Sequence, residues 1–273
     1  MRQLVLSFLL GLLLCGCSGS AADDAARNGP EAVFGFVVLA DLSDRVDSAL
    51  NPGQAQRDIA AARAAFAVFE RHVSEQSFVF SADRFALVAA PQKGTDILYG
   101  ELADSLTIDM NKLSSGGISS FRQARNRAFR GLEELYSGAM RLPSYPGADI
   151  WSFVRHDLST YELIPTRPAP VRNILVILTD GYLAFEDAEL RGRPVGTYMA
   201  AANSSLAVPK LDLSQWEVVV LEMKPRTFND REALEATWRT WFQGMHVRRF
   251  AVYFQQDGQQ HLQDILERWV SAG

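Results

Sequence analysis

The sequence feature that most constrains the fold is a pair of continuous apolar runs. Each run is followed directly by acidic and hydroxyl side chains. The first, Val-Phe-Gly-Phe-Val-Val-Leu-Ala at 33–40, is followed by Asp-Leu-Ser-Asp-Arg at 41–45. The second, Asn-Ile-Leu-Val-Ile-Leu at 173–178, is followed by Thr-Asp-Gly at 179–181. Apolar runs without alternation are typical of strands that are covered on both faces, as in parallel sheets. The polar residues that follow would lie at the carboxyl edge of the sheet, where open α/β folds bind ligands.

Helical and strand patterns alternate along the rest of the chain. Apolar residues recur at spacings of three and four in 51–73 and 114–140, which predicts two long helices. The remaining predicted elements are a shorter helix at 147–158, helices at 229–244 and 259–270, a bent strand or hairpin at 77–91, and strands at 216–223 and 248–254. This order predicts an α/β fold, a doubly wound and mostly parallel sheet with helices on both faces, as one domain over 32–273.

The composition narrows the function classes. The 273 residues carry a formal net charge of −5 and no basic stripe, which argues against a nucleic-acid partner. Enzyme signatures are missing as well. The first strand has no glycine-rich nucleotide turn after it, and Ser43 stands where a haloacid-dehalogenase-like phosphatase needs a second aspartate. The sequence also lacks a Gly-x-Ser-x-Gly elbow, and its four histidines have no metal spacing. We therefore do not expect an enzyme.

The first residues have the pattern of a targeting segment. Arg2 precedes an apolar stretch from Leu4 to Leu14, which is too short to span a bilayer comfortably. The ending Leu-Cys-Gly-Cys at 14–17 resembles the lipobox of bacterial lipoproteins. That resemblance implies a signal peptide at 1–16, a lipidated Cys17 and, at 17–31, a flexible tether to a membrane of the cell envelope. The alternative is an ordinary cleaved signal peptide.

The two strand-end motifs resemble those of the von Willebrand factor type A family, over residues of about 32 to 270. The family motif Asp-x-Ser-x-Ser corresponds to Asp41, Ser43 and, in place of the last serine, Arg45. The family motif Thr-Asp-Gly is present at 179–181, and the glycine-rich loop at 116–120 offers Ser119 or Ser120 in place of a threonine. The resemblance implies a metal-ion-dependent adhesion site that binds another protein. Its ligands to Mg²⁺ or Mn²⁺ would be Asp41, Ser43, Ser119 and Asp180, with Thr179 and Gly181 beside them.

Arg45 leaves the nature of this site open. A guanidinium has only donors and cannot be a metal ligand, so it could pair with Asp41 or Asp180 and replace the charge of the ion. Alternatively, Asp44 supplies an oxygen while Arg45 points to solvent. If Arg45 replaces the charge of the ion, the chain would be a structural subunit of an envelope or secretion-related complex, with a degenerate metal site. The plainest alternative is that both motifs are only turns and helix caps.

The segment at 182–210 is long for a connection in an α/β unit and follows the second motif directly. We expect it to determine partner specificity.

Overall fold

The structure is a computed structural model that describes residues 32–76, 81–90, 95–113, 116–142, 149–164, 169–182, 184–185, 188–189, 211–255 and 262–272. The folded unit comprises Ala32–Gly273. The predicted signal peptide, Cys17 and the tether lie outside the described residues, as does most of the predicted specificity segment. Within the described ranges, every helix is too short or too polar to traverse a lipid bilayer.

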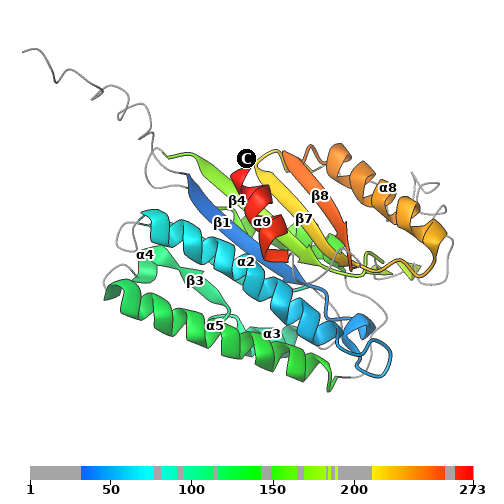
Figure 1. The fold of residues 1–273 in the computed structure, drawn as a ribbon, viewed down its shortest axis with the longest axis horizontal. Coiled ribbons are helices and arrows are strands. Elements are labelled where there is room, and N and C mark those ends of the chain that lie inside the picture. Colours follow the sequence, from blue (N-terminus) through cyan, green and yellow to red (C-terminus); the bar gives the residue numbers. More distant parts are fainter. Residues whose placement is uncertain are drawn as a thin grey trace, which may run out of the picture. The chain divides into compact units, whose positions relative to one another are not determined.

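A six-stranded sheet in the order β3-β2-β1-β4-β7-β8 forms the centre of this unit (Figure 1). The predicted α/β fold with a mostly parallel sheet is confirmed. β1, β2, β4, β7 and β8 are parallel, and only β3 runs the other way. The strands are β1 (Val33–Ala40), β2 (Arg84–Ala89), β3 (Thr107–Asp109), β4 (Val171–Leu178), β7 (Trp216–Met223) and β8 (Arg249–Phe254), and β5 (Ala184–Phe185) pairs with β6 (Ala188–Glu189).

Helices cover both faces of the sheet. The long helices α2 (Gln54–Gln76) and α5 (Gly117–Ala139) pack on one face together with α9 (Leu262–Ser271), as Figure 1 shows. The other face packs against α8 (Phe228–Gly244) and a run of short turns, α6 (Ile150–Ser152), η3 (Phe153–Asp157) and η4 (Leu158–Tyr161). The remaining short helices are η1 (Asp44–Val46), α3 (Thr95–Leu102) and α4 (Met110–Leu113).

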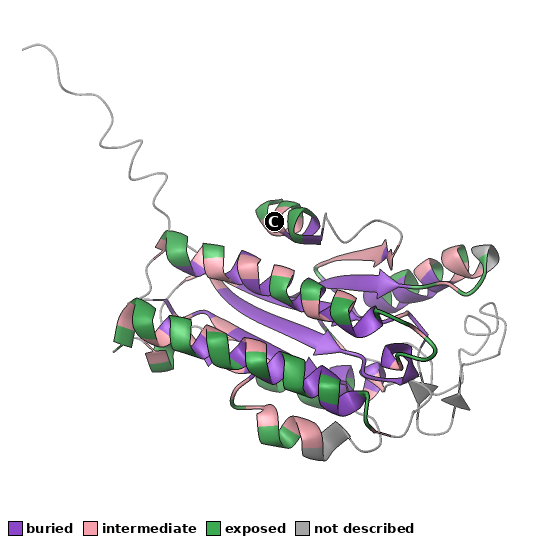
Figure 2. Ribbon diagram, turned by 60° about the horizontal axis from the view of Figure 1, so that its bottom comes forward, coloured by how far each residue is buried: buried purple, intermediate pink, exposed green. Residues whose placement is uncertain are grey.

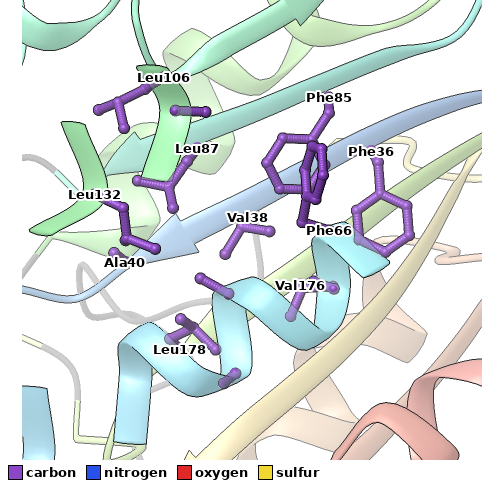
Figure 3. Packing of buried hydrophobic residues seen from close by; sticks show 14 of the residues in the cluster. Phe36, Val38, Ala40, Phe66, Phe85, Leu87, Leu106, Leu132, Val176 and Leu178 are labelled. Carbon is purple, nitrogen blue, oxygen red and sulfur yellow. The ribbon is translucent and has the colours of Figure 1, made fainter. Parts of the chain in front are cut away.

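Each face of the sheet has its own hydrophobic core, and alternate residues of each central strand contribute to one core or the other. Phe36 and Val38 of β1 point to the α2 face, whereas Val37 and Leu39 point to the α8 face. Figure 3 shows the first core, in which Phe66 of α2 packs against strand side chains. The middle strands are buried along almost their whole length, and the helices expose only their outer stripes (Figure 2). Burial on both faces explains why the strand sequences are continuously apolar.

The structure differs from the predicted elements mainly at one edge of the sheet. In the described part of the predicted 77–91 segment, residues 81–90, the strand covers 84–89, and residues 81–83 precede it without regular structure. β3 and α3 have no counterpart among the predicted elements. Three residues are too few to show an alternating pattern, so β3 was not recognisable. Because β3 is antiparallel, it returns the chain to the amino edge of the sheet before α5 begins.

Candidate functional site

The two predicted motifs meet where β1 and β4 end. The strands are in register from Val33 opposite Val171 to Ala40 opposite Leu178. The next residues follow the same pairing, and the Asp41 N–H donates to the Leu178 carbonyl at 3.0 Å. The Thr179 hydroxyl then donates to Asp41 Oδ2 at 2.8 Å. The carboxyl edge therefore brings Asp41, Thr179 and Asp180 together, as the sequence predicted.

Ser43 and Asp44 lie in the turn that follows Asp41. The Ser43 N–H donates to Asp41 Oδ1 at 3.0 Å, so both carboxylate oxygens of Asp41 already accept a hydrogen bond. The Ser43 side chain caps η1 by accepting a hydrogen bond from the Arg45 N–H at 3.5 Å. Asp44 begins η1 and is buried. Ser43 therefore acts here as a helix cap.

Gly181 allows the second motif to turn sharply. Its φ of +93° lies in the left-handed region, and a Cβ at this position would lie 2.4 Å from Met223 Sδ. The Gly181 N–H donates to the Thr179 hydroxyl at 3.1 Å, and its carbonyl accepts from Trp238 Nε1 at 3.1 Å. Trp238 of α8 therefore holds this turn in place. Asp180 lies at the carboxyl edge of the sheet, where its side chain is partly exposed.

Arg45 is buried beneath this cluster, with only 2 % of its surface exposed. Its Nη1 and Nη2 atoms form a two-pronged ion pair with Asp58 of α2, at 2.6 and 2.9 Å. Nη1 also donates to the Asp41 carbonyl at 2.9 Å. The expectations that Arg45 points to solvent, or pairs directly with the Asp41 or Asp180 carboxylate, are therefore wrong. Burial opposes the charged form, but the charges of Asp58 and Asp41 outweigh it and raise the pKa of Arg45.

A hydrogen-bonded network extends this pair across the sheet edge. Asp58 is fully buried and also accepts from Gln54 Nε2 at 2.9 Å and from the Tyr136 hydroxyl at 3.1 Å. Gln54 Nε2 lies 3.3 Å from Glu222 Oε2 at the end of β7. Arg57 Nε approaches the same oxygen at 3.4 Å. Three buried charged residues, Arg45, Asp58 and Glu222, and the partly exposed Arg57 are thus linked from η1 through α2 to β7.

Ser119 and Ser120 are not part of this site. Met110 is hydrogen-bonded to Asp83 at the amino edge of the sheet, and α5 starts soon afterwards at Gly117. Tyr136, which reaches Asp58, comes seventeen residues after Ser119 on the same helix, about 25 Å along its axis. Ser119 therefore lies at the opposite end of α5 from Asp41, because the antiparallel β3 reverses the chain before the helix.

The residues at this edge do not fit a divalent ion. Both carboxylate oxygens of Asp41 already accept hydrogen bonds, and Ser119 is too far away to complete a ligand shell. In the part of the chain that the structure describes, no three acidic, histidine or cysteine side chains converge to hold a metal. The predicted set of Asp41, Ser43, Ser119 and Asp180 is consequently not assembled as a set of ligands for Mg²⁺ or Mn²⁺.

Sequence reasoning missed two central residues of the site, Asp58 and Glu222. Asp58 precedes Ala62 and Phe66 by four and eight positions, so a carboxylate lies on the apolar stripe of its own helix. A carboxylate on the apolar face of a helix was the sequence signal that could have identified Asp58. Glu222 lies near the end of a mostly apolar strand and has a φ of +66°, a strained value for a residue with a side chain. The charge was visible in the sequence, but the backbone conformation was not.

Asp180 has an unusual titration. Although the side chain of Asp180 is partly exposed, its partial burial and then the charge of Asp41 raise its pKa to about 6, and Arg45 only partly offsets them. The folded state therefore favours protonated Asp180 more than the unfolded state does, and the stability from this residue is lost as the pH rises from about 4 to about 6.

Replacing Asp180 with asparagine should stabilise the protein at pH 7.5. We expect Asp180→Asn to raise the free energy of unfolding by about 1–2 kcal/mol, because the neutral amide avoids the charge yet can still accept from the Tyr182 N–H. Urea unfolding at pH 7.5 and pH 4 measures this. The gain should shrink at pH 4, where Asp180 is protonated, and an equal gain at both values would contradict the assignment.

Comparison with known proteins finds no matching family model, no matching curated protein and no matching solved structure. The interpretation of the site therefore depends on its geometry and on the two motifs.

Proposed function

We propose that this chain is a lipid-anchored binding module of the bacterial cell envelope that resembles von Willebrand factor type A domains and binds another protein at the carboxyl edge of its sheet. The observation that carries the proposal is the convergence of Asp41, Thr179 and Asp180 at adjacent strand ends. Arg45 favours the form of the site that does not use a metal, because its buried charge lies where the motif of the resembled family has a serine ligand.

The surface around the strand ends has the mixture of side chains that protein interfaces use. Leu50 follows the first motif and is 62 % exposed. Its neighbour Asn51 accepts a hydrogen bond from Lys224 Nζ at 2.8 Å, and the Lys224 N–H donates to the Asp180 carbonyl at 3.0 Å. An exposed apolar side chain therefore lies on a loop tied to the charged strand ends. Apolar residues bordered by polar ones are typical of interaction sites.

A pull-down from membrane extracts tests the proposal, with Leu50→Asp as the key variant. We expect the native chain to retain the same partner with Mg²⁺ and with chelator, and Leu50→Asp to lose most of it, because a charge enters the apolar contact. The matched control is Ile164→Asp. Ile164 is 79 % exposed and follows Leu163, which is bound to Asn173 near the amino edge of the sheet. Retention that vanishes with chelator, or falls equally in both variants, would contradict the proposal.

The membrane anchor at Cys17 has its own test. One acyl chain binds a membrane only marginally, so a stable anchor needs several chains such as the palmitate groups of mature lipoproteins. Cys17→Ala should abolish labelling by a fatty-acid analogue and leave the precursor unprocessed. Cys15→Ala serves as the control and should leave labelling unchanged. Normal labelling of Cys17→Ala would reject the anchor but would leave the binding site at the sheet edge untested by that result.

A further inference from the structure

The outer edge of β3 has free backbone hydrogen-bonding groups. The Leu87 N–H donates to the Leu106 carbonyl at 3.0 Å, and the Met110 N–H donates to the Asp83 carbonyl at 3.0 Å. In an antiparallel pair, every second residue faces the neighbouring strand. By this alternation, Ile108 faces β2, whereas the N–H and C=O groups of Thr107 and Asp109 point away from it. The Asp109 carbonyl precedes α4 and accepts the first hydrogen bond of that helix, whereas no turn or loop backbone hydrogen bond joins the Thr107 groups or the Asp109 N–H to another residue that the structure describes.

A pocket of about 580 Å³ lies against this edge. Its walls include Arg84 of β2, Tyr99 of α3, Lys112 of α4, Arg127 of α5 and Tyr161 of η4. The volume falls within the range of roughly 300–1,000 Å³ that is usual for ligand sites. Helices and turns supply these walls beside β3.

The pocket is lined by more positive than negative side chains. The Arg84 guanidinium lies over the Tyr161 ring at 5.5 Å, and its buried Nε has no hydrogen-bond acceptor within the described ranges. Among the described residues, no ion pair engages Arg84, Lys112 or Arg127. Asp104 and Asp109 also line the pocket, but Asp109 Oδ1 already accepts from the Asn111 N–H at 3.0 Å. The lining therefore has three cationic side chains against two carboxylates, Asp104 and Asp109, and this net positive charge suits an added carboxylate.

We propose that β3 binds an extended acidic peptide segment of another protein as an added strand. The backbone of the segment pairs with Thr107 and Asp109, and a glutamate or aspartate side chain of the segment binds Arg84, with Arg127 and Lys112 at the rim. Strand addition of this kind derives affinity from main-chain hydrogen bonds and specificity from side-chain pockets. Arg84 begins β2 at the amino edge, so this surface is separate from Asp41 and does not depend on the function proposed there.

Amide hydrogen exchange of the full chain, followed residue by residue by NMR, tests the free edge first. In the free protein we expect fast exchange at the Thr107 and Asp109 amides and slow exchange at Ile108, because only Ile108 faces β2. Slow exchange at Thr107 and Asp109 without any peptide would overturn the proposal, since the edge would already be paired.

The probe is the peptide acetyl-Val-Thr-Glu-Val-Thr-Val-amide, compared with its Glu-to-Gln analogue and with two analogues N-methylated at alternate residues. The acidic peptide should slow exchange at Thr107 and Asp109 when present at about 1 mM, the level of a weak site. The Gln analogue should bind about tenfold more weakly, because it lacks the charge-assisted hydrogen bonds. One of the two N-methylated analogues should fail to bind, since its methyl groups replace the donors that pair with β3.

Arg84→Gln should reduce affinity for the acidic peptide about tenfold. Arg127→Gln, at an exposed rim position, should reduce it by a smaller factor and provides a second test if Arg84→Gln does not fold. Arg122→Gln, an exposed residue of the same helix outside the pocket, should have no effect. The proposal is overturned if the acidic peptide gives no protection, if both N-methylated analogues bind as well as the parent, or if Arg122→Gln weakens binding as much as Arg84→Gln.

Discussion

Replacing Arg45 with methionine should lower the free energy of unfolding by about 3–5 kcal/mol. Asp58 is fully buried, and the substitution leaves its charge with only the donors of Gln54 and Tyr136. Urea unfolding measures the loss. The matched control is Arg63→Met, which breaks an ion pair of 2.5 Å with Glu133 on the surface. Because both partners of that pair are about half exposed, we expect its loss to change stability by less than about 1 kcal/mol.

A second substitution separates the pair from the rest of the site. Adding Asp58→Asn to Arg45→Met should recover a large part of the lost stability, since the amide oxygen still accepts hydrogen bonds and no buried charge remains. Arg45→Ser adds a metal test. If the arginine replaces an ion, Mg²⁺ should raise the melting temperature of Arg45→Ser and leave the native chain unchanged. An equal cost of Arg45→Met and Arg63→Met would show that the buried pair does not hold the site together.

Replacing Trp238 with alanine should lower the free energy of unfolding by about 3–5 kcal/mol. Its indole ring is buried between the sheet and α8 and packs against Trp241 and Phe242. Its Nε1 atom also holds the Gly181 carbonyl, so the loss should reach the second motif. Urea unfolding gives the stability change, and amide exchange at Gly181 and Tyr182 gives the effect on the turn.

Trp238→Phe isolates the hydrogen bond, because most of the ring is kept. We expect faster amide exchange at Gly181 and a loss of about 1–2 kcal/mol. Trp151→Phe is the matched control, since Trp151 is buried on the same face and its Nε1 has no hydrogen-bond partner among the described residues. The assignment fails if Trp151→Phe accelerates exchange at Gly181 as much as Trp238→Phe does.

The strands that carry the site were predictable because each is buried on both faces. Burial of that kind leaves a continuous apolar run, and the polar residue after the run marks the carboxyl edge. Asp41, Thr179 and Asp180 could be placed in this way. Arg45 was noticed as a departure from the motif, but its partner Asp58 comes from a helix, and no local pattern states which helix covers the end of β1.

The placement of Ser119 failed for a different reason. A glycine-rich loop before a helix indicates where the helix starts, but not at which edge of the sheet it starts. That depends on the direction of the preceding strand, and β3 has only three residues. Because β3 is antiparallel, α5 starts at the amino edge of the sheet, and Ser119 lies at the end of α5 that is far from Asp41. Glu222 shows the same limit, because its left-handed backbone follows from the irregular pairing of β7 with β8.

The position of β1 has a mechanical consequence. The folded unit begins at Ala32, directly before β1, and the candidate site begins at Asp41, directly after it. If the chain is anchored ahead of Ala32 and a partner pulls at Asp41, the load acts along a strand about 26 Å long. β1 is bonded to β2 on one side and to β4 on the other. Such a load shears both hydrogen-bonded ladders at once instead of opening them one bond at a time. Under such a load, β1 should therefore resist force better than a strand whose hydrogen bonds open one at a time.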